Sequence, residues 1–363
     1  MARAGIAVLG CEQSVAMYMP MFRYLDNGEF IAAADIVVEK AEKARDIYGA
    51  KRTYTDIDEM LLDADIDGVI VATPHYLHAE HVVKIAEAGK HVLCEKPMAR
   101  TIAECDRMID ACDRNGVILM PAHMKRFNWC FQLADRMIKD GTLGDVAQVR
   151  TQWDTYAQGT DAAYMKHRTL GLACLGFGSH TIDLSRWWLG EVETVSAEVS
   201  IGWKGREVDD QSVMTLRHVD GQVSVHSVSL VFHKPLLEEY TIFGTEATLQ
   251  MRVEGLWSYT SPTPFGMKLY RRERLVEDVT PKILDNIDDT LTRTNHFLKE
   301  MEHFCDCIVN GRTPTITGED GRKATEISNA GYVSSWKKQK VTLPLRESPD
   351  LESFFNELAG MEN

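Results

Sequence analysis

The sequence predicts two domains, an α/β domain at the N-terminus and an α+β domain after it. Its 363 residues exceed what one hydrophobic core usually holds. Short apolar runs alternate with helical patterns through the first third, which is typical of parallel strands joined by crossover helices. After residue 145 the runs become longer and rich in Val and Thr, which indicates a mostly antiparallel open sheet. We therefore predict domains at residues 1–122 and 123–363.

Five apolar runs in the first domain are predicted to be buried parallel strands. They lie at residues 5–10, 30–38, 67–72, 91–94 and 117–120. Apolar residues at helical spacing predict a helix around Val82–Ala86 that stops at Gly89, and a second from Thr101 to Arg114. This alternation predicts a doubly wound Rossmann domain, which binds a dinucleotide beyond the carboxyl ends of its strands.

Six longer runs in the second domain are predicted to be strands. They lie at residues 145–157, 192–203, 210–219, 222–233, 237–252 and 266–279. Asp220-Gly221 separates two of them and is a strong hairpin signal. The last long helix of this domain is predicted at about residues 289–309, because Phe297, Met301, Phe304 and Ile308 follow helical spacing.

Composition excludes several classes of protein. The 40 Lys and Arg against 54 Asp and Glu give a net charge of −14, which argues against a broad nucleic-acid-binding surface. No apolar run approaches the ~18 residues of a membrane span, and no secretory leader is evident. The eight cysteines form no Cys-x-x-Cys pair and no spacing indicates a metal site. We expect a cytoplasmic protein with reduced thiols, no metal, and no membrane or nucleic-acid partner.

The expected cofactor-binding turn departs from the usual pattern. Of Gly-x-Gly-x-x-Gly only Gly10 is present, and Glu12 with Gln13 stands where a pyrophosphate should approach the backbone. Asp35 follows Gly10 by 25 residues and matches the acid that accepts ribose hydroxyls, with a turn residue at the strand end as the alternative. No Lys or Arg occurs in residues 36–38 to bind a 2′-phosphate, which favours NAD over NADP.

A second group of motifs extends over nearly the whole chain. Glu95-Lys96-Pro97 closes a strand that Gly-Lys-His-Val begins. The accompanying motifs are Thr73–His78, Lys125–Asn128, Gly178–His180, Phe243–Glu246 and Gly318–Gly321. Together they resemble the glucose–fructose oxidoreductase, inositol dehydrogenase and rhizopine-catabolism (Gfo/Idh/MocA) family of oxidoreductases.

The resemblance implies that Lys96 lies between nicotinamide and substrate, where its ammonium stabilises developing alkoxide charge. It also implies that Pro97 holds a cis bond and that Glu95 is structural or anchors the cofactor ribose. Further cofactor contacts are expected at the turn after the third strand, from Thr73, Pro74 and His78. The plainer alternatives are a surface lysine before a turn proline, and a histidine that caps the next helix.

The family's second catalytic element is Asp-x-Gly-x-His on a helix. Here His180 fits the base that takes the hydroxyl proton, but Gly176 stands in place of the acid. Asp183 shares the helical face of His180 and is expected to orient its ring, with a salt bridge as the alternative. A packed core histidine is the alternative for His180.

Substrate contacts are expected in the polar, aromatic segment from Asp154 to Arg168, which suits a polyhydroxylated ligand and can also supply the missing acid. Its candidate residues are Tyr156, Tyr164 and His167, and a solvated connection is the alternative. Arg126 is expected to face the cleft, with a structural ion pair as the simpler account.

These observations predict an NAD-dependent oxidoreductase that moves hydride between nicotinamide and a hydroxyl-bearing carbon of a sugar, glycoside or cyclitol. One alternative is NAD-assisted glycoside cleavage by oxidation and elimination. The other is a non-catalytic sugar-sensing or partner subunit, which Glu12 supports and Lys96 and His180 oppose. The resemblance also implies a homodimer or homotetramer that assembles through the C-terminal sheet.

Overall fold

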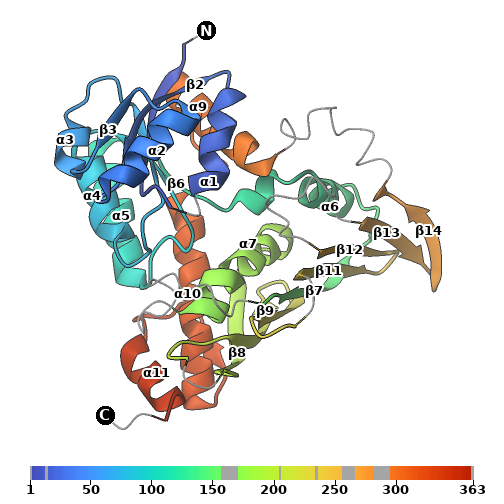
Figure 1. Cartoon of the computed structure of the whole chain (residues 1–363). Coiled ribbons are helices and arrows are strands. Elements are labelled where there is room, and N and C mark those ends of the chain that lie inside the picture. The colour runs from blue at the N-terminus through green and yellow to red at the C-terminus, as the bar shows by residue number, and fades with distance from the viewer. Residues whose placement is uncertain are drawn as a thin grey trace. The chain divides into compact units, whose positions relative to one another are not determined.

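The structure is a computed structural model with two compact units (Figure 1). It describes residues 2–12, 15–156, 171–203, 206–233, 236–255, 266–280 and 295–360. The first unit consists of the described residues of Met1–Phe127 and Asp289–Lys323, and the second of those of Asn128–Asp288 and Ala324–Asn363. The chain thus returns to the first unit late in the sequence, whereas the prediction placed one boundary after residue 122.

The first unit is built on a six-stranded parallel sheet in the order β3-β2-β1-β4-β5-β6. Its strands are β1 (Ala4–Leu9), β2 (Gly28–Ala34), β3 (Arg52–Tyr54), β4 (Gly68–Val71), β5 (His91–Cys94) and β6 (Leu119–Pro121). The predicted Rossmann architecture and its five predicted strands are confirmed. The prediction missed β3, because its three residues include no aliphatic side chain.

Helices between and after these strands complete the first unit, and several of them contribute to its apolar core. They are α1 (Val15–Tyr18), a 3-10 helix (Met19–Arg23), α2 (Val38–Tyr48), α3 (Ile57–Leu61), α4 (His78–Glu87), α5 (Ile102–Asn115), a 3-10 helix (Met124–Phe127) and α9 (His296–Asn310). The predicted helix after β5 is confirmed as α5. It begins with a capping box between Thr101 and Glu104 and ends at Gly116, whose φ of +64° suits glycine.

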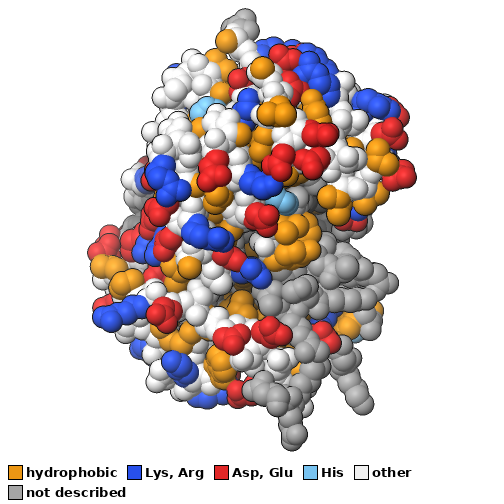
Figure 2. Space-filling model, turned by 90° about the vertical axis from the view of Figure 1, so that its left-hand side faces the viewer, with side chains coloured by type: hydrophobic (Ala, Val, Ile, Leu, Met, Phe, Trp, Pro, Cys, Tyr) orange, Lys and Arg blue, Asp and Glu red, His pale blue; other side chains and the backbone are white. Residues whose placement is uncertain are grey.

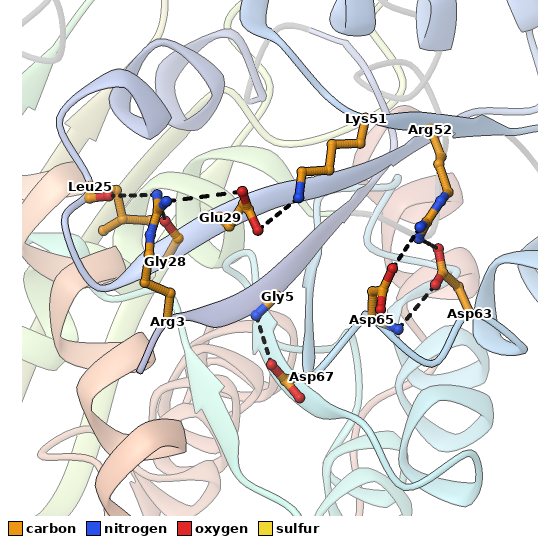
Figure 3. Close-up of polar contacts among 10 residues, drawn as sticks. All are labelled: Arg3, Gly5, Leu25, Gly28, Glu29, Lys51, Arg52, Asp63, Asp65 and Asp67. Atoms are coloured by element: carbon orange, nitrogen blue, oxygen red, sulfur yellow. Dashed lines mark hydrogen bonds and ion pairs between the residues drawn. The ribbon is translucent and has the colours of Figure 1, made fainter. Parts of the chain in front are cut away.

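Charged side chains hold the amino ends of β1, β2 and β3 together (Figure 3). Glu29 accepts ion pairs from Lys51 at 2.8 Å and from Arg3 at 3.9 Å. Arg52 bridges Asp63 and Asp65 at 2.6 and 2.5 Å. These contacts are largely exposed and lie at the end of the sheet opposite the carboxyl ends of the strands, so we assign them a structural role.

The second unit is built on a nine-stranded sheet in the order β14-β13-β12-β11-β7-β10-β9-β8-β15. Its strands are β7 (Val146–Asp154), β8 (Val192–Ser200), β9 (Gln211–His218), β10 (Val223–Ser229), β11 (Leu236–Gly244), β12 (Thr248–Gly255), β13 (Gly266–Arg271), β14 (Arg274–Asp278) and β15 (Val341–Thr342). Its neighbours pair antiparallel except β7 and β10, which confirms the predicted mostly antiparallel sheet.

Turns in this sheet refine the strand predictions. The hairpin at Asp220-Gly221 joins β9 to β10, and Gly221 has a φ of +96°. The predicted runs at 237–252 and 266–279 each divide into two antiparallel strands, because each contains a short turn.

The helices of the second unit differ from the prediction at one point. They are α6 (Trp129–Lys139), a π-helical segment (Leu172–Phe177), α7 (Gly178–Leu189), most of α10 (Gly318–Lys337) and α11 (Leu351–Leu358). The helix predicted at 289–309 is α9, but it belongs to the first unit, and the longer α10 follows it. Hydrophobic periodicity missed α10 because its buried face uses small and polar residues such as Ala324, Ser328 and Asn329.

The distribution of charged side chains and the character of the helices bear on where the protein can act. On the face in Figure 2, Lys and Arg side chains lie among Asp and Glu side chains. Within the described ranges, no helix has both the length and the apolar character that crossing a membrane requires.

Candidate active site

The carboxyl ends of the parallel strands bring the expected cofactor residues to one edge of the first unit. Strand order reverses between β1 and β4, and such a switch point is where doubly wound sheets bind ligands. The segments that leave β1, β2, β4 and β5 begin with Gly10, Asp35, Ala72 and Glu95. The Glu95 amide still donates to the Val71 carbonyl at 2.9 Å, so the β5 turn starts in sheet register.

The turn after β1 is closely packed against its neighbours. Gly10 has a φ of +94°, and a Cβ there would lie 2.8 Å from the carbonyl carbon of Ala72, so only glycine fits. The Cys11 amide donates to Asp35 Oδ2 at 2.7 Å, and the Val37 amide donates to Asp35 Oδ1 at 2.9 Å. The Asp35 carboxylate is therefore fixed at the end of β2.

Glu12 does not leave an isolated negative charge in this turn. Its carboxylate pairs with Lys40 Nζ at 3.0 Å, and the two side chains are 63% and 36% exposed. The sequence indicated only the departure from glycine, because the partner lies in α2, 28 residues later. Gln13 lies outside the described residues.

These residues fit the ribose end of a dinucleotide. Each Asp35 oxygen accepts one backbone amide, and a carboxylate oxygen has a second lone pair that a ribose hydroxyl can use. Asp35 is partly exposed, so this lone pair is within reach of a ligand. Gly10 permits close backbone approach, and Lys40 compensates the charge of Glu12.

His78 connects two turns at the same edge. Its ring is 1% exposed, with Nε2 2.8 Å from the Thr73 carbonyl oxygen and Nδ1 3.1 Å from the Pro97 carbonyl oxygen. Burial lowers the pKa of His78 to about 4. This geometry gives His78 a structural role, while cofactor contacts by Thr73, Pro74 and His78 stay predictions.

The turn after β5 carries Lys96 among other ionisable groups. The Lys96–Pro97 bond is cis, as the resemblance implied. Lys96 is partly accessible, yet burial of its ammonium lowers its pKa, Glu95 opposes this shift and Lys125 adds to it. The Lys96 amide donates to Glu95 Oε2 at 3.0 Å. Burial raises the pKa of Glu95, against the influence of Lys96.

Lys125 is a buried ammonium that the sequence reasoning did not assign to the site. Its side chain is 4% exposed, and it follows the carboxyl end of β6, a position that was available as a signal. Its neighbour Arg126, predicted to face a substrate cleft, forms an ion pair with Asp320 at 3.1 Å and is 11% exposed. That pair matches the simpler account, and contact between Arg126 and substrate stays a prediction.

In the second unit, α7 carries both predicted proton-handling residues. His180 and Asp183 are 1% and 0% exposed. The His180 ring stacks on Trp153 with centroids 5.3 Å apart and an interplanar angle of 26°. Phe177 contacts the Trp153 ring edge-on, with centroids 5.3 Å apart. Aromatic packing therefore orients His180, and the catalytic roles of His180 and Asp183 stay predictions.

The π-helical segment that precedes α7 is held by Asp209, which sequence reasoning missed. The amides of Leu172 and Cys174 each donate to its carboxylate at 2.7 Å. The Tyr332 hydroxyl donates to the same carboxylate at 3.3 Å and accepts from the Leu175 amide at 3.2 Å. Burial raises the pKa of Asp209 to about 6. Two adjacent acids directly before a strand were the available signal.

Gly176 lies in the π-helical segment just before His180, where the family pattern has an acid. A Cβ at this position would meet the Gly171 carbonyl oxygen at 3.4 Å and Leu172 Cδ1 at 3.9 Å. These are ordinary van der Waals contacts. Steric exclusion therefore does not explain the glycine.

The described part of the predicted substrate segment contains an aromatic group. Tyr156 is 43% exposed, and its ring contacts Trp203 at 5.5 Å and His233 at 4.9 Å. Asp154, at the start of the segment, is 6% exposed, and burial raises its pKa. Tyr164 and His167 lie outside the described residues. Among the residues that the structure describes, no three His, Cys, Asp or Glu side chains form a metal-binding group.

Comparison with known proteins gives relatives that match most of the chain and others that match about half of it. The chain is 26% identical over 353 residues to the myo-inositol 2-dehydrogenase of Thermotoga maritima, covering 93% of this chain and 98% of the relative. It is 31% identical over 206 residues to the 2,7-anhydro-N-acetylneuraminate hydratase of Mediterraneibacter gnavus, covering 54% of each. The crystal structure of an aldose-aldose oxidoreductase from Caulobacter crescentus superimposes with a TM-score of 0.82 at 26% identity, covering 94% of this chain and all of the other.

Two family models match successive parts of the chain. Residues 4–123 match the oxidoreductase family with an NAD-binding Rossmann fold. Residues 131–250 match the GFO/IDH/MocA C-terminal domain. The fixed Asp35 carboxylate, the Lys96 turn and the large open sheet agree with this pair of domains. The chain therefore belongs to the Gfo/Idh/MocA oxidoreductase family and has its NAD(P)-binding Rossmann domain and its C-terminal domain.

Proposed function

We propose that this protein is an NAD-dependent dehydrogenase or reductase that acts on a hydroxyl-bearing carbon of a sugar, glycoside or cyclitol. The observation that carries the proposal is the Lys96 ammonium at the carboxyl end of β5, whose pKa is lowered by burial. The names of the myo-inositol and aldose relatives support the class of substrate. A bound nicotinamide supplies the site that accepts or returns the hydride.

Lys96 acts on the substrate oxygen. Its ammonium donates a hydrogen bond to the hydroxyl that is being oxidised and stabilises the negative charge that develops on this oxygen. The lowered pKa of Lys96 brings its acidity closer to that of a group that exchanges protons near neutral pH. The Lys96 backbone amide is tied to Glu95, which restricts the turn that carries the side chain.

His180 takes the hydroxyl proton in the oxidative direction and returns it in the reductive direction. Stacking on Trp153 limits rotation of the imidazole, so the basic nitrogen keeps one orientation. Asp183 is proposed to orient His180 from one helical turn away. Asp154 is a candidate for the acid that Gly176 does not supply, since burial raises its pKa and favours the protonated form.

We propose NAD as the cofactor, with Asp35 accepting the ribose hydroxyls. A carboxylate at this position repels a 2′-phosphate. The nearby cation, Lys40, is engaged by Glu12 at 3.0 Å, which reduces its attraction for a phosphate. Both features support NAD over NADP.

The aromatic group of Tyr156, Trp203 and His233 supports a carbohydrate or cyclitol substrate. The Trp203 and His233 rings are 6.2 Å apart and nearly parallel, at 17°. Sugar rings stack on aromatic faces of this kind, and hydroxyls need polar groups around them. We propose that the group contacts the part of the substrate that does not react.

The test is direct measurement of cofactor binding and turnover. Calorimetry with NAD⁺ and NADP⁺ should give binding that favours NAD⁺. A screen of cyclitols, aldoses and glycosides should then give an increase of NADH absorbance with at least one compound. Failure of the protein to bind either dinucleotide would contradict the proposal and favour a non-catalytic subunit.

Oxidation followed by elimination is a second candidate, which the hydratase relative favours. It predicts product without net NADH, because the hydride returns to the substrate after the elimination. Product analysis by chromatography at equal substrate consumption separates the two reactions.

We propose a homodimer or homotetramer that forms through the sheet of the second unit. Alternate residues of β9 point to opposite sides, so Met214 and Leu216 are buried while Val213 is 51% exposed. An exposed sheet face with such residues is a suitable self-association surface. Light scattering after size exclusion should give two or four times the 40.9 kDa of one chain, and the mass of a single chain would contradict the proposal.

A further inference from the structure

Four buried polar side chains of the second unit form a continuous chain of hydrogen bonds that the proposed reaction does not use. Ser224 and His226 lie on β10. Thr151 lies on β7, and His218 ends β9. These strands are neighbours in the order β7-β10-β9. The four residues are at most 4% exposed, and α7 packs on β7 and β10 (Figure 1). The hydrogen-bond chain therefore lies in the interior of the second unit and crosses three adjacent strands.

Each link of this hydrogen-bond chain has the length of a hydrogen bond. His226 Nδ1 lies 3.0 Å from Thr151 Oγ1, and His226 Nε2 lies 2.9 Å from Ser224 Oγ. Ser224 Oγ also lies 3.0 Å from His218 Nε2. His218 Nδ1 lies 2.9 Å from the carbonyl oxygen of Gly190, the C-cap residue of α7. The hydrogen-bond chain thus connects β7 with the C-terminal end of the helix on which we place the base.

Only one arrangement of hydrogens satisfies every link when both histidines are neutral. The Gly190 carbonyl oxygen can only accept, so His218 Nδ1 carries the hydrogen and His218 Nε2 accepts from the Ser224 hydroxyl. Ser224 has no second hydrogen, so its oxygen accepts from His226 Nε2. His226 Nδ1 then accepts from the Thr151 hydroxyl. The hydrogen bonds therefore all run in one direction, from β7 toward Gly190.

Both histidines are neutral near pH 7. Burial lowers the pKa of His226 to about 3, and the nearby His218 adds to this shift. Burial also lowers the pKa of His218, against its hydrogen bond to Gly190. Arg186 adds to this lowering and Glu191 opposes it. Arg186 and Glu191 form an ion pair with each other, so their charges partly cancel at His218.

Strand β9 and the residues that flank it contact the helical region at both of its ends. Asp209, just before β9, accepts two backbone amides of the π-helical segment that precedes α7. At the other end of β9, His218 donates to Gly190, and the Val219 amide donates to the Glu191 carbonyl oxygen at 2.9 Å. The bond from His218 is therefore the side-chain anchor at the C-terminal end of α7.

We propose that the hydrogen-bond chain holds His218 with its Nδ1 hydrogen toward Gly190 and thereby anchors the C-terminal end of α7, which keeps the His180 ring on Trp153. Thr151 lies two residues before Trp153 and on the same face of β7, so the hydrogen-bond chain starts beside the ring on which His180 stacks. Its four members act through α7 and are positioning residues. The inference rests on the proposed role of His180 in proton transfer.

Nitrogen NMR of the cofactor-free protein, with the histidine rings labelled, tests the arrangement of hydrogens without any assay of activity. Near pH 7 the wild-type protein should carry the ring hydrogen on Nδ1 in His218 and on Nε2 in His226. A hydrogen on Nε2 of His218, or on Nδ1 of His226, overturns the proposal. This measurement needs no variant, so it decides even if every substitution prevents folding.

Two substitutions of His218 test the anchor. His218→Leu removes both ring nitrogens, whereas His218→Asn places an amide N–H near the position of Nδ1. The Trp153 ring shifts the His180 ring protons upfield, because the two rings are stacked. His218→Leu should move these resonances toward those of an unstacked histidine, and His218→Asn should restore much of the wild-type shift. Identical His180 resonances in folded His218→Leu and wild type overturn the proposal.

A matched pair on β10 tests the middle of the hydrogen-bond chain. Ser224→Ala removes the hydroxyl that links the two histidines, so the His180 resonances should move as they do in His218→Leu, by a smaller amount. Ser227→Ala removes a hydroxyl from the opposite face of the same strand and should leave them unchanged. Equal changes in the two serine variants contradict a specific role of Ser224.

Turnover tests the consequence for the reaction. Ser224→Ala should lower kcat roughly tenfold through displacement of His180, while NAD affinity stays unchanged because the dinucleotide binds to the first unit. Ser227→Ala should change neither. A purely structural role of Ser224 would lower the melting temperature and leave both kcat and the His180 resonances of the folded protein as in wild type. If the protein has no dehydrogenase activity, the proposed function fails, and the NMR measurements still decide whether the hydrogen-bond chain positions His180.

Discussion

Lys96 and His180, the two residues to which we assign the reaction, are held by different kinds of neighbour. Lys96 lies on a turn surrounded by ionisable groups, with Glu95 and Lys125 acting on its pKa in opposite directions. His180 lies on α7 and stacks on Trp153, and the π-helical segment that precedes α7 is held by Asp209, whose carboxylate accepts two backbone amides. The groups around Lys96 act on its protonation state, whereas the groups around His180 act on the orientation of its ring.

The largest expected effect tests the electrostatic half of this comparison. Lys96→Met keeps an unbranched side chain and removes the charge, so kcat should fall by roughly 10³-fold or more while NAD affinity changes little. Stopped-flow absorbance of NADH and calorimetry measure the two quantities. Lys84→Met removes an exposed lysine of α4 that pairs with Asp58, and it should leave both unchanged. Equal turnover by Lys96→Met would remove Lys96 from the mechanism.

The next largest effect tests how the position of His180 is maintained. Asp209→Asn leaves one of the two helix amides facing an NH₂ group, which should destabilise the fold by about 2 kcal/mol and lower kcat by about 10²-fold through displacement of His180. The neighbouring Asp210 is equally buried but accepts from the Gly202 amide at 2.6 Å instead. Asp210→Asn should destabilise the fold with a smaller loss of kcat. Equal losses of kcat in both variants would contradict a specific role of Asp209.

Stability should also depend on pH through Asp209. Its pKa of about 6 in the folded protein exceeds the ordinary 3.8, so the folded state binds the proton more tightly than the unfolded chain. The corresponding stabilisation is complete below about pH 4 and is lost as the pH rises through about 6, by roughly 3 kcal/mol in all. Urea unfolding at several pH values should show this loss in the wild-type protein and not in Asp209→Asn.

A smaller effect is expected from restoring the acid of the family pattern at residue 176. Gly176→Asp places a carboxyl in the family's position, and the nearest contact of the new Cβ, at 3.4 Å, is tolerable. We expect kcat to rise on the order of tenfold. Gly176→Ala adds the Cβ without the carboxyl and should leave kcat unchanged. A fall in kcat with both variants would show that the π-helical segment requires glycine.

The smallest effect concerns the choice of cofactor. Glu12→Gln releases Lys40 from its ion pair, so the affinity for NADP⁺ relative to NAD⁺ should rise about fivefold. Lys40→Gln should not produce this rise. Calorimetric titration of both variants with both dinucleotides measures the ratio, and an unchanged ratio in Glu12→Gln would place Lys40 out of reach of the 2′-phosphate.

The sequence predicted those strands, helices and turns that depend on residues close together in the chain. The alternation around β4, α4 and β5 specified the Rossmann sheet, and Asp220-Gly221 specified a hairpin, because both signals are local. The motif around Lys96 was equally informative. The family models that match residues 4–123 and 131–250 confirm the family that this motif predicted. Short β3 and polar α10 were missed because neither carries the hydrophobic period on which the prediction relied.

Long-range partners could not be predicted in the same way. Asp209 contacts Leu172 and Cys174 across more than 30 residues, and Tyr18 contacts Glu300 across 282. Lys40 compensates Glu12 only because α2 returns beside the β1 turn. Such pairs follow from tertiary packing, and no residue spacing in a single sequence indicates them.

Cys11 gives the β1 turn a chemical property of its own. Its thiol lies 3.5 Å from the Ala34 carbonyl oxygen, and burial, followed by the charge of Asp35, raises its pKa to about 12. The thiolate is the form that oxidants and alkylating agents attack. A sulfur beside the expected cofactor therefore stays almost entirely protonated at neutral pH, and the turn should withstand peroxide or iodoacetamide that would modify an ordinary exposed cysteine.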